Sequence, residues 1–106
     1  MGSLDGRSAL VTGGSTLIGH GVVSALLEAG AEVTVADIDE RLLLFINGFN
    51  AEHGTGIRIF FTDLRVELPP GLHGQFDLVF TDPPYSEDGV GLFLQRAICA
   101  LKERDF

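Results

Sequence analysis

The residues best suited to chemistry are the glycine-rich run 12–19 (TGGSTLIG) and Asp37, which lies further along the chain. Glycines let the backbone approach a phosphate, and a helix that begins at their end offers unpaired N–H groups. A carboxylate at Asp37 can accept hydrogen bonds from two ribose hydroxyls and would repel a 2′-phosphate. The pattern predicts a dinucleotide site that favours NAD over NADP. The alternative is a set of ordinary turn glycines, with Asp37 as a helix cap.

A second chemical motif is the run 81–85 (TDPPY). Asp82 and the carbonyl groups of Pro83 and Pro84 can accept hydrogen bonds from an amine, and Tyr85 can form a wall beside it. The prolines fix the turn. If the motif holds an attacking amine, Asp82 and Tyr85 are the candidate catalytic residues. The alternative is a proline stop after a strand, with Tyr85 as surface packing.

Asp63 and Leu64 follow another apolar run and suit an adenine ring. The Asp63 carboxylate can accept a hydrogen bond from the adenine amino group, while the Leu64 N–H reaches a ring nitrogen. The alternative is a solvated loop aspartate. Together with the glycine-rich run, the expected cofactor contacts come from Gly13, Ser15, Ile18, Gly19, Asp37, Asp63 and Leu64.

Alternating apolar periods predict the elements that position these residues. The expected strands are 8–12, 32–36, 57–61 and 76–81, and the expected helices are 17–29, a segment capped by Asp39, and 90–101. This alternation predicts one α/β domain over residues 1–106, with a parallel sheet in the order 3-2-1-4 and helices on both faces. Such a domain is half of a Rossmann-like three-layer sandwich, and its ligand should lie at the carboxyl ends of the strands.

Composition excludes several classes of function. The formal net charge of −8 argues against a nucleic-acid partner. The absence of a signal-peptide pattern and of an apolar run of about 18 residues predicts a cytoplasmic protein without membrane contact. His20, His53 and His73 fall on different elements, so no metal site is expected. Cys99, the one cysteine, is expected to be a small buried residue.

Residues 4–39 resemble the short-chain dehydrogenase/reductase family, through 4–14 (LDGRSALVTGG), Ile18-Gly19 and Ala36-Asp37. The resemblance implies that Gly13, Ser15, Ile18 and Gly19 line a dinucleotide and that Asp37 binds the adenosine ribose. Leu17 replaces the middle glycine of the family motif. The Tyr-x-x-x-Lys pair of that family is also missing, because Gly89 stands four positions after Tyr85. Hydride transfer is therefore not expected.

Residues 37–102 resemble a different family, the branched-chain polyamine synthases, through 36–43 (ADIDERLL), 62–65 (TDLR), 76–85 (FDLVFTDPPY) and 89–94 (GVGLFL). These are aminopropyltransferases with a methyltransferase-like Rossmann fold that use decarboxylated S-adenosylmethionine. The DPPY segment is also similar to the motif of amino-group methyltransferases. The N-terminal domain and later strands of the family are not found in the chain, so neither catalytic site is expected to be complete.

The two resemblances meet near residues 36–40, which predicts an engineered or chimeric half-domain that binds NAD without turnover. A natural, divergent protein is the alternative origin. The alternative functions are a transferase fragment that binds S-adenosylmethionine or its decarboxylated form, and a scaffold that binds no cofactor. The strand at 76–81 should lie at an open edge carrying Phe76, Leu78, Val79 and Phe80. Such an edge predicts a homodimer, by sheet extension or by exchange of the last helix.

Overall fold

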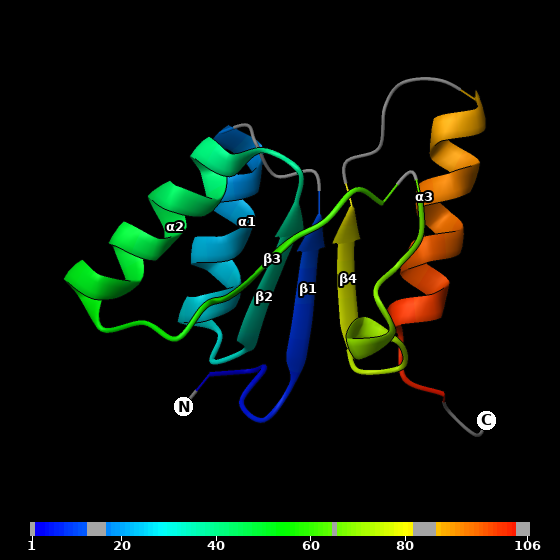
Figure 1. Cartoon of the computed structure of the whole chain (residues 1–106). Helices are drawn as coiled ribbons and strands as arrows, with labels where there is room; N and C mark the ends of the chain where they lie inside the picture. Colours follow the sequence, from blue (N-terminus) through cyan, green and yellow to red (C-terminus); the bar gives the residue numbers. More distant parts are fainter. Residues whose placement is uncertain (1, 13–16, 65, 82–86, 104–106) are drawn as a thin grey trace.

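Four short apolar runs form strands, and the amphipathic segments between them form helices that cover the sheet (Figure 1). The computed structural model describes residues 2–12, 17–64, 66–81 and 87–103, with the backbone alone for 17–20 and 87–88. In chain order, the elements are β1 (Ser8–Thr12), α1 (Leu17–Glu28), β2 (Glu32–Asp37), α2 (Glu40–His53), β3 (Arg58–Phe61), the 3-10 turn η1 (Pro70–Leu72), β4 (Leu78–Thr81) and α3 (Glu87–Ala100).

The strands pair in parallel in the order β3-β2-β1-β4, which confirms the predicted topology. Thr12 at the end of β1 is level with Ala36 of β2 and with Thr81 of β4. Asp37 at the end of β2 is level with Phe61 of β3. The carboxyl ends of all four strands therefore reach the same edge of the sheet, where the sequence places the ligand.

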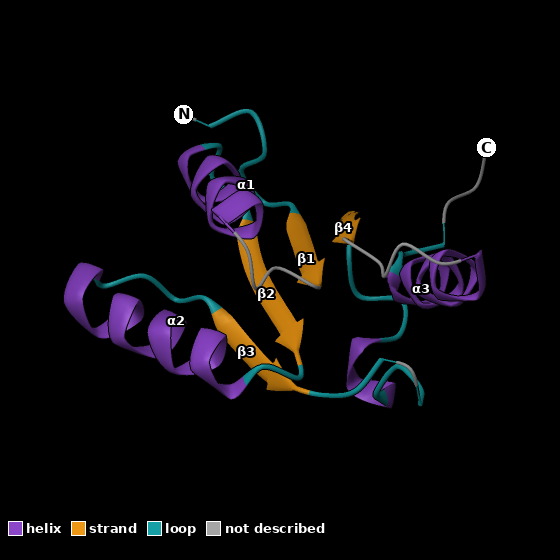
Figure 2. Cartoon of the chain, turned by 90° about the horizontal axis from the view of Figure 1, so that it is seen from above, coloured by secondary structure: helices purple, strands orange, loops and turns teal. Residues whose placement is uncertain are grey.

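Helices α1 and α2 lie on one face of the sheet and α3 on the other (Figure 2). Each face has its own apolar core. On one face, α1 and α2 cover alternate strand residues that include Val11 and Val35. On the other face, α3 and the connection between β3 and β4 cover Leu10 and Ala36. Successive strand residues point to opposite faces, so a strand buried on both sides must be apolar throughout. This explains why β1 and β2 appear in the sequence as continuous apolar runs.

Local sequence signals fix the helix ends. Gly30 has φ +91°, and the N–H groups of Gly30 and Ala31 donate to the carbonyls of Leu27 and Leu26 at the end of α1. This is a Schellman motif, and its left-handed position favours glycine. At the start of α2, the Asp39 carboxylate accepts from the Arg41 N–H at 3.0 Å. The predicted aspartate cap is confirmed, and Gly30 ends the helix expected over 17–29.

The residues before β4 differ from the prediction. The strand begins at Leu78, whereas Phe76 forms a parallel bridge with Leu101, beyond the end of α3. The Lys102 N–H donates to the Phe76 carbonyl at 2.8 Å, and Phe76 is 2% exposed. Phe76 is therefore a core residue and not part of an open edge, because the chain that follows α3 returns to cover it.

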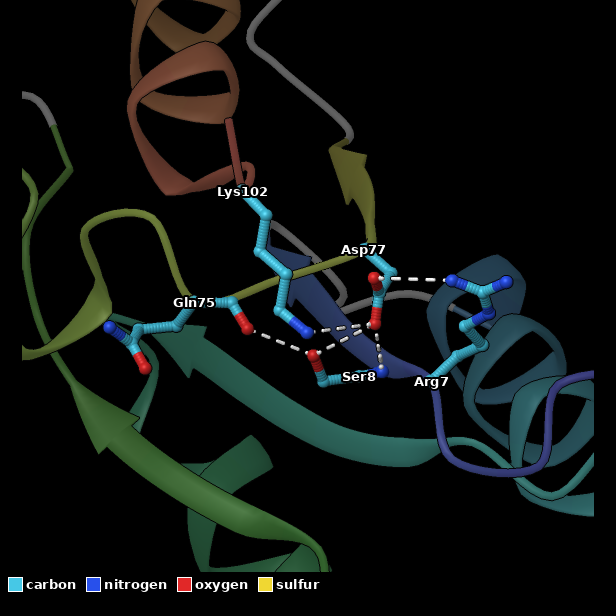
Figure 3. A network of polar contacts seen from close by, with 5 residues as sticks. All are labelled: Arg7, Ser8, Gln75, Asp77 and Lys102. Atoms are coloured by element: carbon cyan, nitrogen blue, oxygen red, sulfur yellow. Dashed lines mark hydrogen bonds and ion pairs between the residues drawn. The ribbon is translucent and has the colours of Figure 1, made fainter. Parts of the chain in front are cut away.

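A network around Asp77 holds together the amino ends of β1 and β4, opposite the predicted site (Figure 3). The Asp77 Oδ2 accepts from the Ser8 N–H at 2.9 Å and from Lys102 Nζ at 3.3 Å, and Oδ1 lies 3.6 Å from an Arg7 nitrogen. The hydrogen bond from Ser8, followed by Lys102 and Arg7, lowers the pKa of Asp77 against the raising effect of burial. The network is structural, because it joins three segments at the end of the sheet opposite the carboxyl ends of the strands.

The outer side of α3 carries an exposed apolar stripe of Val90, Leu94 and Ile98, at helical spacing. The β4 strand pairs with β1 on one side, and within the described residues no named strand pairs with its other side. Cys99 is also exposed on α3, so its predicted burial is wrong. Cys99 lies on the solvent-exposed side of α3. The helical periodicity of the sequence does not show which side of this helix packs against the sheet. Among the described helices, none is long and apolar enough to cross a bilayer.

Candidate functional site

The strands β1 and β4 each end in a threonine, and the two threonines pair. The Thr12 Oγ1 donates to the Thr81 Oγ1 at 2.8 Å, and Thr12 is buried. Their strands are adjacent and in register at this level, so the contact follows from the sheet topology. The pair places two hydroxyl groups at the carboxyl ends of β1 and β4. Sequence reasoning did not single out Thr81, because its partner lies 69 residues away.

Asp37 is the most constrained polar group at this edge. It is 7% exposed, and its Oδ1 accepts from the Asp39 N–H at 2.9 Å in a local turn. Its Oδ2 is buried and has no hydrogen-bond partner among the described residues. A buried acceptor left unpaired costs about 1–3 kcal/mol, and more when it is charged. The carboxylate thus fits a ligand that brings hydroxyl donors, as the ribose of an adenine nucleoside does.

The segment after β3 is tied to the same edge. The Asp37 carbonyl accepts from the Thr62 N–H at 2.9 Å, and the Asp63 carbonyl accepts from the Val66 N–H at 3.1 Å. Leu64 is 5% exposed and packs in the core under α3. Asp63 and Leu64 therefore follow the strand next to the one that ends at Asp37.

Arg96 of α3 also reaches this segment and was missed at the sequence level. Its Nε donates to the Leu64 carbonyl and its Nη2 donates to the Val66 carbonyl, both at 3.0 Å. No spacing rule connects a helix residue with carbonyls about thirty positions earlier. An arginine amid the apolar residues of α3 was the available signal, because a half-buried guanidinium needs acceptors.

Several predicted site residues lie outside the described residues. These are Gly13 and Ser15 in the glycine-rich run, and Asp82 and Tyr85 after β4. Ile18 and Gly19 fall in the first turn of α1, where the backbone alone is described. The structure therefore places Asp37 at the end of β2 and Asp63 and Leu64 just after β3. The ligand contacts predicted for all of these residues stay predictions.

The described part of the chain offers no group of three or more His, Cys, Asp or Glu arranged to hold a metal ion. His53 packs its ring 4.4 Å from that of Phe49, and a ring nitrogen of His73 lies 2.8 Å from the Leu68 carbonyl. An apolar cavity of about 120 Å³ lies between α1 and α2, with Phe45 and Phe49 on its wall. Among the described residues of its lining, Ser24 is the one polar residue, so the cavity has almost no polar groups to orient a nucleoside.

Comparison with known families assigns the chain. The family described as branched-chain polyamine synthase A C-terminal domain matches residues 1–106. The chain belongs to this family. The match runs without a break through residues 36–40, so it lends no support to a fusion junction there.

Individual relatives agree with that assignment. The chain is 42% identical over 100 residues to an uncharacterized protein of Methanocaldococcus jannaschii, covering 94% of this chain and 25% of that protein. It is 36% identical over 102 residues to the N(4)-bis(aminopropyl)spermidine synthase of Thermococcus kodakarensis, covering 95% of this chain and 28% of the synthase. The chain therefore spans about a quarter of the length of these relatives.

A solved structure shows the same fold with ligands bound. The branched-chain polyamine synthase of Thermus thermophilus, in complex with N4-aminopropylspermidine and 5′-methylthioadenosine, superposes with a TM-score of 0.81. Its sequence identity with the chain is 29%, over 93% of this chain and 28% of the synthase. This likeness supports the Rossmann-like topology and the membership of the polyamine synthase family.

The resemblance to dehydrogenases is narrower. The 2,3-dihydroxy-2,3-dihydro-p-cumate dehydrogenase of Pseudomonas putida is 44% identical over 72 residues, which cover 66% of this chain and 28% of the enzyme. That match is partial, whereas the polyamine synthase family covers the whole chain. The sequence-based preference for NAD thus gains no support from the family, which favours the alternative of a sulfonium cofactor.

Proposed function

We propose that this chain is the cofactor-binding part of an aminopropyltransferase that uses decarboxylated S-adenosylmethionine. The observation that carries the proposal is the buried Asp37 carboxylate, whose Oδ2 has no partner within the described residues. Ribose hydroxyls would supply the missing donors. Membership of the polyamine synthase family supports this cofactor, because 5′-methylthioadenosine, bound by the Thermus thermophilus relative, is the nucleoside that remains after an aminopropyl group leaves.

In this proposal, residues at the ends of two neighbouring strands contact different parts of the nucleoside. Asp37 would bind the ribose, and Asp63 with the Leu64 N–H would bind the adenine. The glycine-rich run leads into the start of α1, where unpaired N–H groups can contact the ligand. These roles keep the residues predicted from the sequence and replace the dinucleotide with a single nucleoside.

The bound cofactor would supply a sulfonium-bound carbon to an attacking amine. Asp82 is expected to accept the hydrogen bond and then the proton of that amine, and Tyr85 to form a wall beside it. The formal net charge of −8 would raise the local concentration of a polycationic acceptor such as a polyamine. Binding is the first property to test, because the relatives are about four times as long as this chain.

Titration calorimetry with decarboxylated S-adenosylmethionine, 5′-methylthioadenosine and NAD tests the proposal. We expect heat from the first two ligands, and we expect it to disappear in Asp37→Ala. Heat from NAD alone would contradict the proposal and favour the second candidate, a dinucleotide module, which the similarity to the Pseudomonas putida dehydrogenase supports. The absence of binding heat with all three ligands would favour a scaffold that binds no cofactor.

A further inference from the structure

Arg96 connects α3 to the segment that follows β3. Its Nε and Nη2 donate to the carbonyls of Leu64 and Val66, each at 3.0 Å. A guanidinium is planar, and its donors have a fixed separation, so two bonds from one group fix both position and orientation. The carbonyls at both ends of this short segment are therefore held by one side chain.

The constraint matters because it orients one backbone donor. The Asp63 carbonyl points to the Val66 N–H, with a distance of 3.1 Å between the oxygen and the nitrogen. In a trans peptide the C=O and N–H point in opposite directions, so the Leu64 N–H points away from Val66. Among the described residues, no hydrogen bond takes the Leu64 N–H. A donor is thus left available where the sequence predicts a contact with an adenine ring nitrogen.

Arg96 also lies close to the strand ends. Thr12, Thr81, Leu64 and Arg96 line one tight contact between the sheet edge and α3, with no room for a water molecule. Leu64 cannot turn easily, because its side chain is buried in this contact. Removing the guanidinium would leave two carbonyls without their donor and free the backbone on either side of residue 65.

We propose that Arg96 is a positioning residue that gives the site its specificity for adenine, by holding the Leu64 N–H toward the ring nitrogen N1. The inference rests on the proposed function, because it needs a bound adenine nucleoside. In this proposal, Arg96 acts through the Leu64 backbone and does not itself contact the ligand. Lysine would not replace it, since an ammonium group is a single point of charge and cannot bridge two fixed carbonyls.

The test compares 5′-methylthioadenosine with its 1-deaza analogue, which lacks only the N1 acceptor. We expect the wild-type chain to bind the natural nucleoside about three- to tenfold more tightly, the effect of one neutral hydrogen bond. In Arg96→Met and Arg96→Lys this ratio should fall to about one. The ratio between 5′-methylthioadenosine and its 2′-deoxy analogue, which reports on Asp37, should stay unchanged in both variants. Arg58→Met removes the same charge from β3 and should leave both ratios unchanged.

Each outcome has a distinct meaning. A preference for N1 that survives in a folded Arg96→Met would overturn the role of Arg96 and leave the proposed function intact. If the wild-type chain binds neither nucleoside, both the role of Arg96 and the proposed function are overturned. If Arg96→Met does not fold, the binding ratio in Arg96→Lys and the amide NMR signal of Leu64 in the wild type test the role of Arg96 instead. That signal should move less with the 1-deaza analogue than with 5′-methylthioadenosine, and an equal shift would contradict the proposal.

Discussion

Replacing Asp37 by asparagine should weaken ligand binding without destabilising the free chain. In the wild type, Oδ1 is occupied by the Asp39 N–H, and the buried Oδ2 has no partner among the described residues. The asparagine carbonyl can keep the bond from the Asp39 N–H. Its amide group would then occupy the position of Oδ2, where it cannot accept a hydroxyl hydrogen.

The magnitude follows from the bond that is lost. A hydrogen bond to a charged group contributes about 1.5–3 kcal/mol, so Asp37→Asn should bind 5′-methylthioadenosine roughly 10- to 150-fold more weakly. In the free chain, the substitution replaces a buried carboxylate, one of whose oxygens is unpaired, with a neutral amide. The free energy of unfolding should therefore stay equal or rise by about 1 kcal/mol.

Titration calorimetry measures the first quantity, and urea denaturation measures the second. Asp39→Asn is the matched control, because it removes the same charge two residues away. Asn and Asp are equivalent as helix caps, so this variant should change neither quantity by more than about 0.5 kcal/mol. Unchanged affinity in Asp37→Asn, or a loss of stability above about 2 kcal/mol, would refute the assigned role of the carboxylate.

Three further predictions concern the scaffold. The lowered pKa of Asp77 means that its contribution to stability is present above about pH 4 and is lost as the pH falls through the folded-state pKa. Urea titrations at acidic pH should show a weaker pH dependence in Asp77→Asn, and an unchanged one would contradict this. Gly30→Ala should lower the free energy of unfolding by about 1–3 kcal/mol, because φ is +91° and the new methyl group meets Asp5. A variant whose free energy of unfolding in urea equals that of the wild type would contradict this. We propose that a second copy covers the open side of β4 and the α3 stripe, so light scattering should give a dimer mass for the wild type and a monomer mass for Leu94→Lys. A monomeric wild type would refute the dimer.

The topology could be predicted because alternating apolar periods leave few alternatives. Once the strands at 8–12 and 32–36 are parallel, right-handed connections fix the order of the sheet. Gly30 and Asp39 could also be assigned, because their signals are local and act within a few residues. Asp37 and Asp63 could be proposed as site residues for a related reason, since each lies at or just after the carboxyl end of an apolar strand.

Contacts between distant segments could not be predicted. Phe76 was placed on an open edge because the return of the chain at Leu101 has no pattern of its own. The bonds of Arg96 depend on how α3 packs over the Leu64 segment, which periodicity does not specify. The choice of cofactor also stayed open, because a carboxylate after the second strand suits a ribose in either family.

The central claim is that the carboxyl edge of the sheet binds the nucleoside of a sulfonium cofactor. Amide NMR of the 106-residue chain during titration with 5′-methylthioadenosine tests it most directly. We predict saturable shifts at Thr12, Asp37, Leu64 and Thr81, and none at Asp77, at the opposite end of the sheet. Shifts confined to the cavity between α1 and α2, or no shifts at millimolar ligand, would contradict the account.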